Sequence, residues 1–165
     1  MMHKIIILEG PDGGGKSTLA AWLHKIHGYD IVKTGPPSPT GDVTATYLCA
    51  LHDAAQRSGL TVFDRLHLGE AIYGPLLRGV DRMGAPGLTV IECAIKHYGV
   101  KLVICSPPWE TLVAGWSSKD DLLKSMAHLR TVRDEYWLHA ERLGLQVYDW
   151  TADDAENVLK GMIEI

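Results

Sequence analysis

The sequence predicts an α/β fold in which a five-stranded parallel sheet lies between helices on both faces. Five short β-rich runs alternate with segments of helical periodicity, an order typical of parallel sheets with right-handed crossovers. A glycine-rich turn also stands directly between the first run and the first helical segment. Ligands of such sheets bind beyond the carboxyl ends of the strands, so this turn marks the edge to search.

The five expected strands are short and bounded by polar or turn-forming residues. The first is a continuous aliphatic run, as expected for a strand that is buried on both faces. In chain order the strands are residues 4–8, 29–33, 60–63, 101–105 and 145–148.

The first two crossovers each contain an expected helix. Residues 17–26 place several apolar side chains on one side, which is the pattern of a helix packed on a sheet. The proline-rich residues 35–39 form a stiff loop that fits neither a helix nor a strand. Asp42 then begins a helix that reaches about residue 58, with Gly59 as its stop.

The second half of the chain continues the alternation with helices of unequal length. Periodicity indicates helices before and after a glycine- and proline-containing loop, then a short helix opened by two prolines, and a last helix capped by Thr151. The expected segments are a helix at 67–79, a loop at 79–86, a helix at about 88–98, a short helix from 107, and the longest helix at 120–143.

Length and charge limit the classes of function. The 165 residues suit one domain, residues 1–165, and 46% hydrophobic residues can fill one core. A net charge of −4 argues against a non-specific nucleic-acid binder, which needs a basic surface. The sequence shows no signal peptide or membrane span, so a cytoplasmic protein without a membrane partner is expected.

Cysteine and histidine give no sign of a metal or disulfide site. Cys49, Cys93 and Cys105 are isolated in apolar stretches, which predicts buried thiols in a reducing compartment. His24 and His27 are the closest histidine pair and have no acidic or cysteine ligand beside them.

Residues 10–17 match the phosphate-loop pattern G-x-x-x-x-G-K-[ST] between a strand and a helix. Glycines let backbone N–H groups turn toward phosphate oxygens, and the helix adds its positive N-terminal end. Lys16 is expected to reach the β- and γ-phosphates, and Ser17 to bind magnesium (Mg²⁺). The pattern therefore predicts binding of ATP with Mg²⁺ as the cofactor.

A second constellation, Asp64 and Arg65, stands at the end of the third expected strand. The acid is placed to hold Mg²⁺ or to orient an attacking oxygen, and the arginine to clamp an acceptor phosphate. A surface ion pair at a strand exit is the alternative interpretation.

Together, residues 9–18 and the stretch 64–75 resemble thymidylate kinase and its relatives, most closely the small forms encoded by bacteriophages. The resemblance implies a P-loop kinase three-layer sandwich. It also implies phosphoryl transfer from ATP to a deoxynucleoside monophosphate (dNMP), such as dTMP, giving a dNDP and ADP. The acceptor would be a small-molecule nucleotide.

The resemblance assigns roles to individual residues. Asp12 would approach the acceptor sugar, Arg65 would clamp the acceptor phosphate, and Tyr73 would lie near the nucleoside or in the core. Asp64 and Ser17 would hold Mg²⁺, and Glu9 would orient part of the site. The nucleotide phosphates would be bound by the loop residues Gly10, Asp12, Gly13, Gly14, Gly15, Lys16, Ser17 and Thr18.

The chain departs from the family pattern at the acceptor and in the lid. Gly74 follows Tyr73 where the family has glutamine, so recognition of thymine is open. The phosphate loop has no arginine, and the short lid at about 107–121 carries only Lys119. Transition-state charge must then be neutralised from elsewhere.

Arginines outside the lid are the candidates for that task. Arg130 and Arg133 lie one turn apart on the expected long helix, where they either enter the site catalytically or face solvent. Arg78 and Arg82 are candidates on the acceptor side.

Two residues are candidates for contacting adenine. Trp116 either stacks on the base or packs the lid against the domain. Thr151 lies in the segment 149–152 after the last strand, where this fold brings the adenine edge.

Other functions and partners fit the same motifs. The acceptor could be a nucleoside or a hydroxymethylated base in DNA, although nucleic acid is disfavoured by the charge. A low-turnover ATP-binding regulatory module is a third interpretation. The apolar segment 88–98 and the helix from Asp42 could pair two subunits as a homodimer or belong to the core.

Overall fold

The computed structural model describes residues 4–35, 38, 40–116, 123 and 125–160. It contains a five-stranded sheet with the order β2-β3-β1-β4-β5, in which every pair of neighbours is parallel. The predicted five-stranded parallel sheet is confirmed. The strands are β1 (Ile5–Glu9), β2 (Asp30–Lys33), β3 (Thr61–Asp64), β4 (Lys101–Cys105) and β5 (Gln146–Tyr148).

The aliphatic run of β1 is explained by burial on both faces of the sheet. Ile5 and Ile7 belong to one core cluster, whereas Ile6 and Leu8 belong to a second cluster on the other face. All five residues of β1 are buried. Side chains alternate along a strand, so a strand between two helical layers needs apolar residues at every position.

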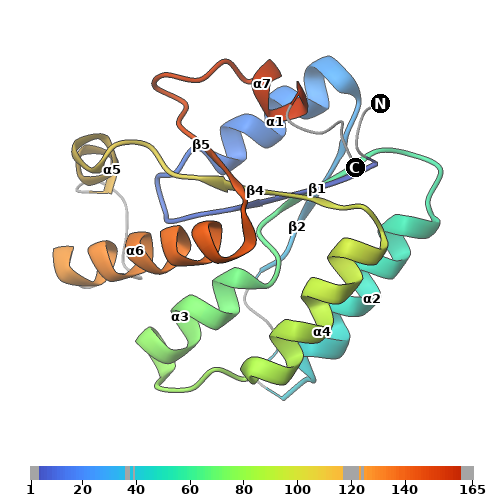
Figure 1. Cartoon of the computed structure of the whole chain (residues 1–165), viewed down its shortest axis with the longest axis horizontal. Coiled ribbons are helices and arrows are strands. Elements are labelled where there is room, and N and C mark those ends of the chain that lie inside the picture. The colour runs from blue at the N-terminus through green and yellow to red at the C-terminus, as the bar shows by residue number, and fades with distance from the viewer. Residues whose placement is uncertain (1–3, 36–37, 39, 117–122, 124, 161–165) are drawn as a thin grey trace.

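Helices cover both faces (Figure 1). α1 and α7 pack on one face, while α2, α3, α4 and α6 pack on the other. α5 lies beyond the carboxyl end of β4, near the left edge of the view. The bounds are α1 (Lys16–His27), α2 (Val43–Gln56), α3 (Leu68–Arg78), α4 (Gly84–His97), α5 (Trp109–Trp116), α6 (Met126–Leu143) and α7 (Glu156–Lys160).

Two predicted helix starts are corrected. α4 begins at Gly84 rather than at 88, because Pro86 occupies the first turn, where a missing N–H costs nothing. α6 begins at Met126, with the Ser125 hydroxyl accepting a hydrogen bond from His128 N. The earlier part of the expected long helix, residues 120–122 and 124, lies outside the described residues.

Thr151 does not cap the last helix. Its hydroxyl donates to Asp149 Oδ1 at 2.7 Å in a turn after β5. α7 begins later, and Asp154 Oδ1 accepts from Glu156 N at 3.0 Å. A local Asp–Thr turn thus competes successfully with the capping role.

The prediction of buried thiols is correct for Cys105 and wrong for Cys49 and Cys93, which are exposed. The two exposed cysteines lie on the outer sides of α2 and α4, because apolar neighbours in sequence do not decide which face of a helix a residue occupies. Among the described helices, none has the length and apolar character needed to span a bilayer.

Candidate functional site

The phosphate loop between β1 and α1 is held against the end of β4. Gly10, Gly13 and Gly15 adopt φ angles of 140°, 78° and 90°, which L side chains rarely adopt. A Cβ at Gly10 or Gly14 would lie 2.2 or 2.4 Å from the carbonyl oxygen of Cys105. Only glycine therefore lets the loop follow this path.

Lys16 is buried at the start of α1. Its Nζ donates to the carbonyl oxygens of Gly10 at 2.9 Å and Pro11 at 2.6 Å, so the ammonium lies inside the loop. Burial, with the nearby Arg65 charge, lowers the pKa of Lys16 to about 8. An anion in the loop would stabilise the charged form.

Ser17 and Asp64 meet at the carboxyl edge of the sheet. The Ser17 hydroxyl donates to Asp64 Oδ2 at 2.7 Å, and Asp64 is paired in register with Leu8 of β1. A hydroxyl and a carboxylate are the hard oxygen ligands that Mg²⁺ prefers, together with water and phosphate. The two residues predicted to hold Mg²⁺ are thus adjacent and chemically suited to it. No group of three or more His, Cys, Asp or Glu that could bind a metal occurs in the described parts of the chain.

Arg65, Asp12 and Tyr73 form a cluster beside the loop. The Arg65 guanidinium donates to Asp12 Oδ1 and, at 3.4 Å, to the Gly10 carbonyl oxygen. It also lies 5.5 Å from the centroid of the Tyr73 ring, whose hydroxyl donates to Asp12 Oδ2 at 3.4 Å. Three of the residues predicted for the acceptor side are thus brought together from the loop, the β3 end and α3.

The backbone of Arg65 is held in a rare conformation. Its φ of 75° is positive, and no other non-glycine residue in the described ranges shares this feature. The Thr34 hydroxyl donates to the Arg65 carbonyl oxygen at 2.8 Å, and Arg65 N donates to the Leu8 carbonyl oxygen at 3.0 Å. These bonds aim the side chain toward the loop.

The Glu9 carboxylate holds the turn between β3 and α3, which follows Arg65. Its Oε1 accepts from the backbone N–H groups of Leu66 at 2.9 Å and Leu68 at 3.0 Å, and its Oε2 from the Tyr136 hydroxyl at 3.3 Å. Complete burial raises the pKa of Glu9, although these N–H donors and Arg65 oppose the shift. Burial also lowers the pKa of His67, 4.0 Å away, to about 3, so this histidine is neutral.

Two cavities open at this edge of the sheet. The loop cavity, of about 810 Å³, is lined by the phosphate loop with Thr18, Lys33, Asp64 and Trp150 among others. The α3 cavity, of about 300 Å³, lies between the loop, α2 and α3. The residues that line both cavities are Asp12, Thr34, Gly35 and Arg65.

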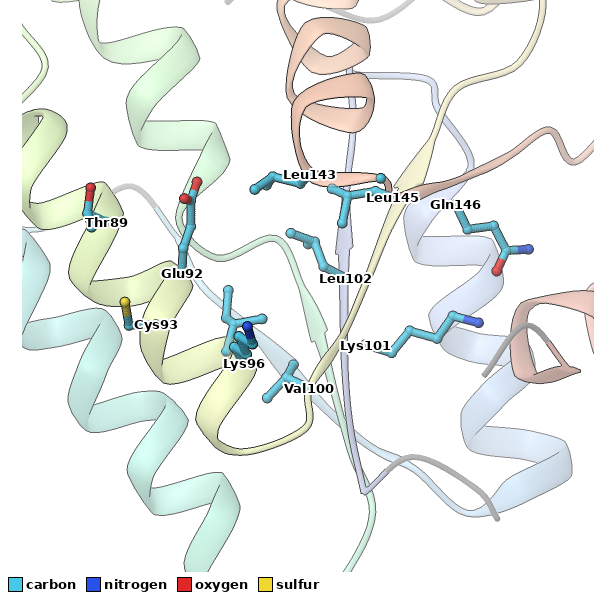
Figure 2. A pocket seen from close by; sticks show the side chains of 12 residues that line it. Thr89, Glu92, Cys93, Lys96, Val100, Lys101, Leu102, Leu143, Leu145 and Gln146 are labelled. Carbon is cyan, nitrogen blue, oxygen red and sulfur yellow. The ribbon is translucent and has the colours of Figure 1, made fainter. Parts of the chain in front are cut away.

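A third hollow, of about 530 Å³, lies at the opposite end of the sheet (Figure 2). Aliphatic side chains such as Leu102, Leu143 and Leu145 point into it, whereas Lys101 and Gln146 point to the other side of β4. No residue predicted for the site lines this hollow, so the candidate site is at the carboxyl edge.

Several predicted residues lie outside both cavities. Arg130 stacks on Trp109 with 4.9 Å between the guanidinium carbon and the ring centroid. Arg133 lies 5.7 Å from the Trp137 centroid and pairs with Asp134 at 3.3 Å. The exposed Thr151 and the core-packed Trp116 also line neither cavity.

Arg78 and Arg82, the two arginines predicted for the acceptor side, lie in different places, and only Arg78 lines a cavity. Arg78 lines the α3 cavity and donates to Glu70 Oε2 at 2.6 Å. Arg82 instead donates to the carbonyl oxygens of Ser38 and Gly41, so it ties the loop before α2 to the start of α4.

Among the further residues that line the two cavities, Trp150 was predicted only as part of the segment 149–152, and Lys33 and Glu70 were absent from the predicted site. Trp150 packs on the loop so closely that a Cβ on Gly15 would lie 2.6 Å from its Cδ1 atom. Lys33 lines the loop cavity, and Glu70 is buried in the wall of the α3 cavity. Lys33 and Trp150 share a signal of position, because Lys33 ends β2 and Trp150 follows β5 at the same sheet edge, whereas Glu70 within α3 has no such signal.

Solved structures share this architecture across nearly the whole chain. The YorR protein of Bacillus subtilis, solved in complex with phosphorylated GDP, is 22% identical with a TM-score of 0.73, covering 94% of this chain and 91% of that chain. Deoxyadenosine kinase of M. mycoides with bound dATP is 15% identical with a TM-score of 0.58, covering 97% and 96%. Shikimate kinase of Acinetobacter baumannii with shikimate is 17% identical with a TM-score of 0.56, covering 95% and 89%.

At these identities the likeness shows the fold, which is that of the P-loop kinases. The sequence matches no protein-family model and no curated protein.

Proposed function

We propose that this protein is a kinase that transfers the γ-phosphoryl group of ATP, with Mg²⁺, to a deoxynucleoside monophosphate, giving a dNDP and ADP. The observation that carries the proposal is the junction of the two cavities at Arg65 and Asp12. The loop cavity is lined by residues 12–17 of the phosphate loop, whereas the α3 cavity has only Asp12 from it, so the donor and the acceptor would meet where Asp12 and Arg65 lie.

The loop cavity would hold ATP. The phosphates would be bound by backbone N–H groups of the loop, by the N-terminal end of α1 and by Lys16. To reach them, the Lys16 ammonium would exchange its hydrogen bonds to the loop carbonyl oxygens for bonds to phosphate oxygens. Ser17 and Asp64 would hold Mg²⁺, which supplies charge neutralisation on the phosphates. Trp150, rather than Trp116, is placed to offer an aromatic face to adenine.

The α3 cavity would hold the acceptor. Arg65 would exchange its bond to Asp12 for the acceptor phosphate, since a guanidinium fork binds two phosphate oxygens at once. Asp12 and the Tyr73 hydroxyl would then contact the acceptor sugar. The protein contributes positioning and charge neutralisation, as expected for in-line phosphoryl transfer.

The lid, residues 107–121, would close over the transferring group. α5 belongs to it and lies beside the loop, since a Cβ added at Gly13 would lie 3.6 Å from a Leu112 side-chain atom. Residues 117–121 lie outside the described residues. We propose that the Arg130 side chain, or alternatively that of Arg133, breaks its contact with the neighbouring tryptophan and neutralises the negative charge of the transition state. The cost of breaking that contact is small, because an exposed cation–π contact contributes only about 0.5–1 kcal/mol.

Two of the three structural relatives are consistent with a nucleotide ligand, whereas the third was solved with shikimate. Deoxyadenosine kinase was solved with dATP, and the YorR protein with phosphorylated GDP. These ligands are properties of those proteins, and they support a nucleotide as the acceptor here better than a sugar or a shikimate-like acid.

A low-turnover ATP-binding module is the second candidate. Among the described residues, the cations that line the loop cavity are Lys16, Lys33 and Arg65, and Arg65 also faces the acceptor. If no further arginine joins the site, nucleotide binding would persist with slow turnover.

The deciding experiment is ADP release from the purified protein with ATP and Mg²⁺ over a panel of acceptors. The panel contains deoxynucleoside monophosphates, hydroxymethyl-dUMP, thymidine and hydroxymethylated DNA. Stimulation of at least about 100-fold by one monophosphate, abolished in Lys16→Ala, is expected. Stimulation by DNA or thymidine alone would change the acceptor class, and tight ATP binding without stimulation would establish the second candidate.

A further inference from the structure

The α3 cavity has a second charged end beyond Arg65. Glu70 and Arg78 line it together with Tyr47, Tyr73 and Leu77. Arg65 and Asp12 lie at the junction with the loop cavity, so Glu70 and Arg78 lie where the part of an acceptor remote from its phosphate would be.

Glu70 is a buried acid with one oxygen unused. The residue is 4% exposed and its side chain 1%. Oε2 accepts from Arg78 Nη2 at 2.6 Å, whereas Oε1 is buried and has no hydrogen-bond partner among the described residues. A buried carboxylate oxygen without a donor costs free energy, and buried polar atoms in folded proteins are nearly always paired. A ligand with an N–H group would supply the donor.

Gly74 makes this arrangement possible. Glu70 and Arg78 are eight residues apart on α3, a rise of roughly 12 Å, and Gly74 lies midway on the same stripe. A Cβ there would lie 3.1 Å from Arg78 Nη2 and 3.3 Å from Glu70 Oε1. It would also lie 2.8 Å from the Val80 carbonyl oxygen. The absence of a side chain lets the arginine reach back across the helix.

We propose that Glu70 and Arg78 read the base of the acceptor and select bases that present a ring N–H beside a carbonyl group, as thymine, uracil and guanine do. This inference rests on the proposed function. Glu70 Oε1 accepts from the ring N–H, and the free N–H groups of Arg78 donate to the carbonyl oxygen. Both residues are specificity-determining and take no part in the transfer itself.

The pair should favour keto bases over amino bases because the two kinds of base offer Arg78 different numbers of acceptor lone pairs. A carbonyl oxygen offers two lone pairs to a guanidinium fork, whereas the ring nitrogen beside an amino group offers one. An ion pair that presents one acceptor beside several donors therefore suits an N–H next to a carbonyl. The walls of the cavity, which include Leu77 and two tyrosines, would hold the faces of the base.

The test compares kcat/KM for dTMP, dUMP and dGMP with kcat/KM for dCMP and dAMP. The wild type is expected to favour the keto group by about 10-fold or more, because an amino base pairs only in the reverse order, with its NH₂ group on Glu70 and its ring nitrogen accepting one bond fewer from Arg78. Glu70→Gln keeps the shape of the side chain. It should lower kcat/KM for keto acceptors by about 100-fold, with little change for amino acceptors and with the Kd of ATP unchanged.

The matched control is Glu92→Gln, which removes the same charge from a glutamate paired with Arg142 outside both cavities. It should leave the keto-to-amino ratio as in the wild type. Arg78→Lys is the second variant if Glu70→Gln does not fold, because the half-exposed Arg78 head can be replaced by an ammonium that keeps the charge beside Glu70 and loses the guanidinium fork. It should change the ratio in the same direction.

Equilibrium binding of the same monophosphates separates failure of the inference from failure of the proposed function. Keto nucleotides that bind the wild type but not Glu70→Gln, without turnover of any acceptor, would support the inference and refute the kinase. Turnover with an unchanged ratio in both variants, or a wild-type preference for amino bases, would overturn the inference alone. If no monophosphate binds, both are refuted.

Discussion

Lys16 combines a charge with burial, and this makes nucleotide binding depend on pH. Burial lowers its pKa to about 8, and phosphates in the loop should raise it again toward the ordinary value. At about pH 8.5 the free protein holds this amine largely neutral, so ATP binding is expected to take up most of one proton.

Calorimetry of ATP binding in two buffers of different ionisation enthalpy measures that proton. Lys16→Met should abolish the uptake, and at about pH 7, where Lys16 is already charged, the uptake should be small. Binding enthalpies that are equal in the two buffers at the higher pH would contradict the burial of a neutralised Lys16.

The guanidinium of Arg65 lies in the site, but the Arg65 backbone has a strained, positive φ of 75°. Arg65→Ala and Arg65→Gly both remove the side chain, but only glycine adopts this φ without strain. Arg65→Gly should therefore be more stable to urea than Arg65→Ala by about 1 kcal/mol.

The matched pair is Arg57→Ala and Arg57→Gly, because Arg57 has an ordinary φ of −66° at the end of α2. There alanine should be equal to or more stable than glycine. Equal stabilities for the two variants at position 65 would show that the Arg65 backbone is not strained.

At the residue level, motif spacing predicted the pairs that strand ends bring together and missed those that tertiary packing decides. Ser17 and Asp64 follow adjacent parallel strands, so their contact at 2.7 Å could be expected from order alone. The choice between Trp116 and Trp150 could not, because Trp116 ends α5 and Trp150 follows β5, and only packing shows that Trp150 covers Gly15. Glu70 was missed because a pair eight residues apart matches no local helix rule.

Between elements, Glu9 links β1 to the turn that joins β3 and α3. Replacement by alanine would leave the buried N–H groups of Leu66 and Leu68 without an acceptor. Glu9→Ala is therefore expected to lower the free energy of unfolding by about 3 kcal/mol, since each unsatisfied buried donor costs about 1–3 kcal/mol. Urea denaturation measures this loss.

Glu9→Gln retains an acceptor oxygen, so it should lose less stability than Glu9→Ala. Glu135→Ala, at an exposed position of α6, should change stability by less than about 0.5 kcal/mol. A loss below about 1 kcal/mol for Glu9→Ala would mean that water or rearrangement satisfies the turn.

The strands were more predictable than the helix ends. A continuous aliphatic run between two helical layers has few alternatives, whereas the start of a helix depends on single hydrogen bonds. The sequence predicts Pro86 as the end of a loop and Thr151 as a helix cap, but Pro86 lies in the first turn of α4 and the Thr151 hydroxyl donates to Asp149. Burial of Cys49 and Cys93 was equally hard to predict, because a shift of one residue along a helix can move a side chain from the core face to the surface.

The order of the strands places the two cavities side by side. β1 is central, with β3 and β4 as neighbours, so the loop after β1 lies between the turn after β3 and the end of β4. The chain order alone does not reveal that β2 lies at the edge rather than beside β1. The meeting of the phosphate loop with Asp64 and Arg65 nevertheless follows from a parallel sheet, since all carboxyl ends share one edge.

Because Asp12 and Arg65 line both the loop cavity and the α3 cavity, we expect that one molecule can fill both. An analogue that links adenosine to thymidine through a polyphosphate chain would test this at the scale of the whole protein. Binding of the second half becomes intramolecular, so the analogue is expected to bind at least about 100-fold more tightly than ATP or dTMP alone. Calorimetry or a competition assay with labelled ATP measures the gain.

The gain should depend on the junction rather than on either cavity alone. Arg65→Gly should bring the affinity of the linked analogue close to that of ATP, because the acceptor phosphate loses its clamp while the phosphate loop stays intact. Arg57→Gly, outside both cavities, should keep the full gain. If the linked analogue binds the wild type no more tightly than ATP, the two cavities do not act as one site, and the donor and acceptor must meet elsewhere.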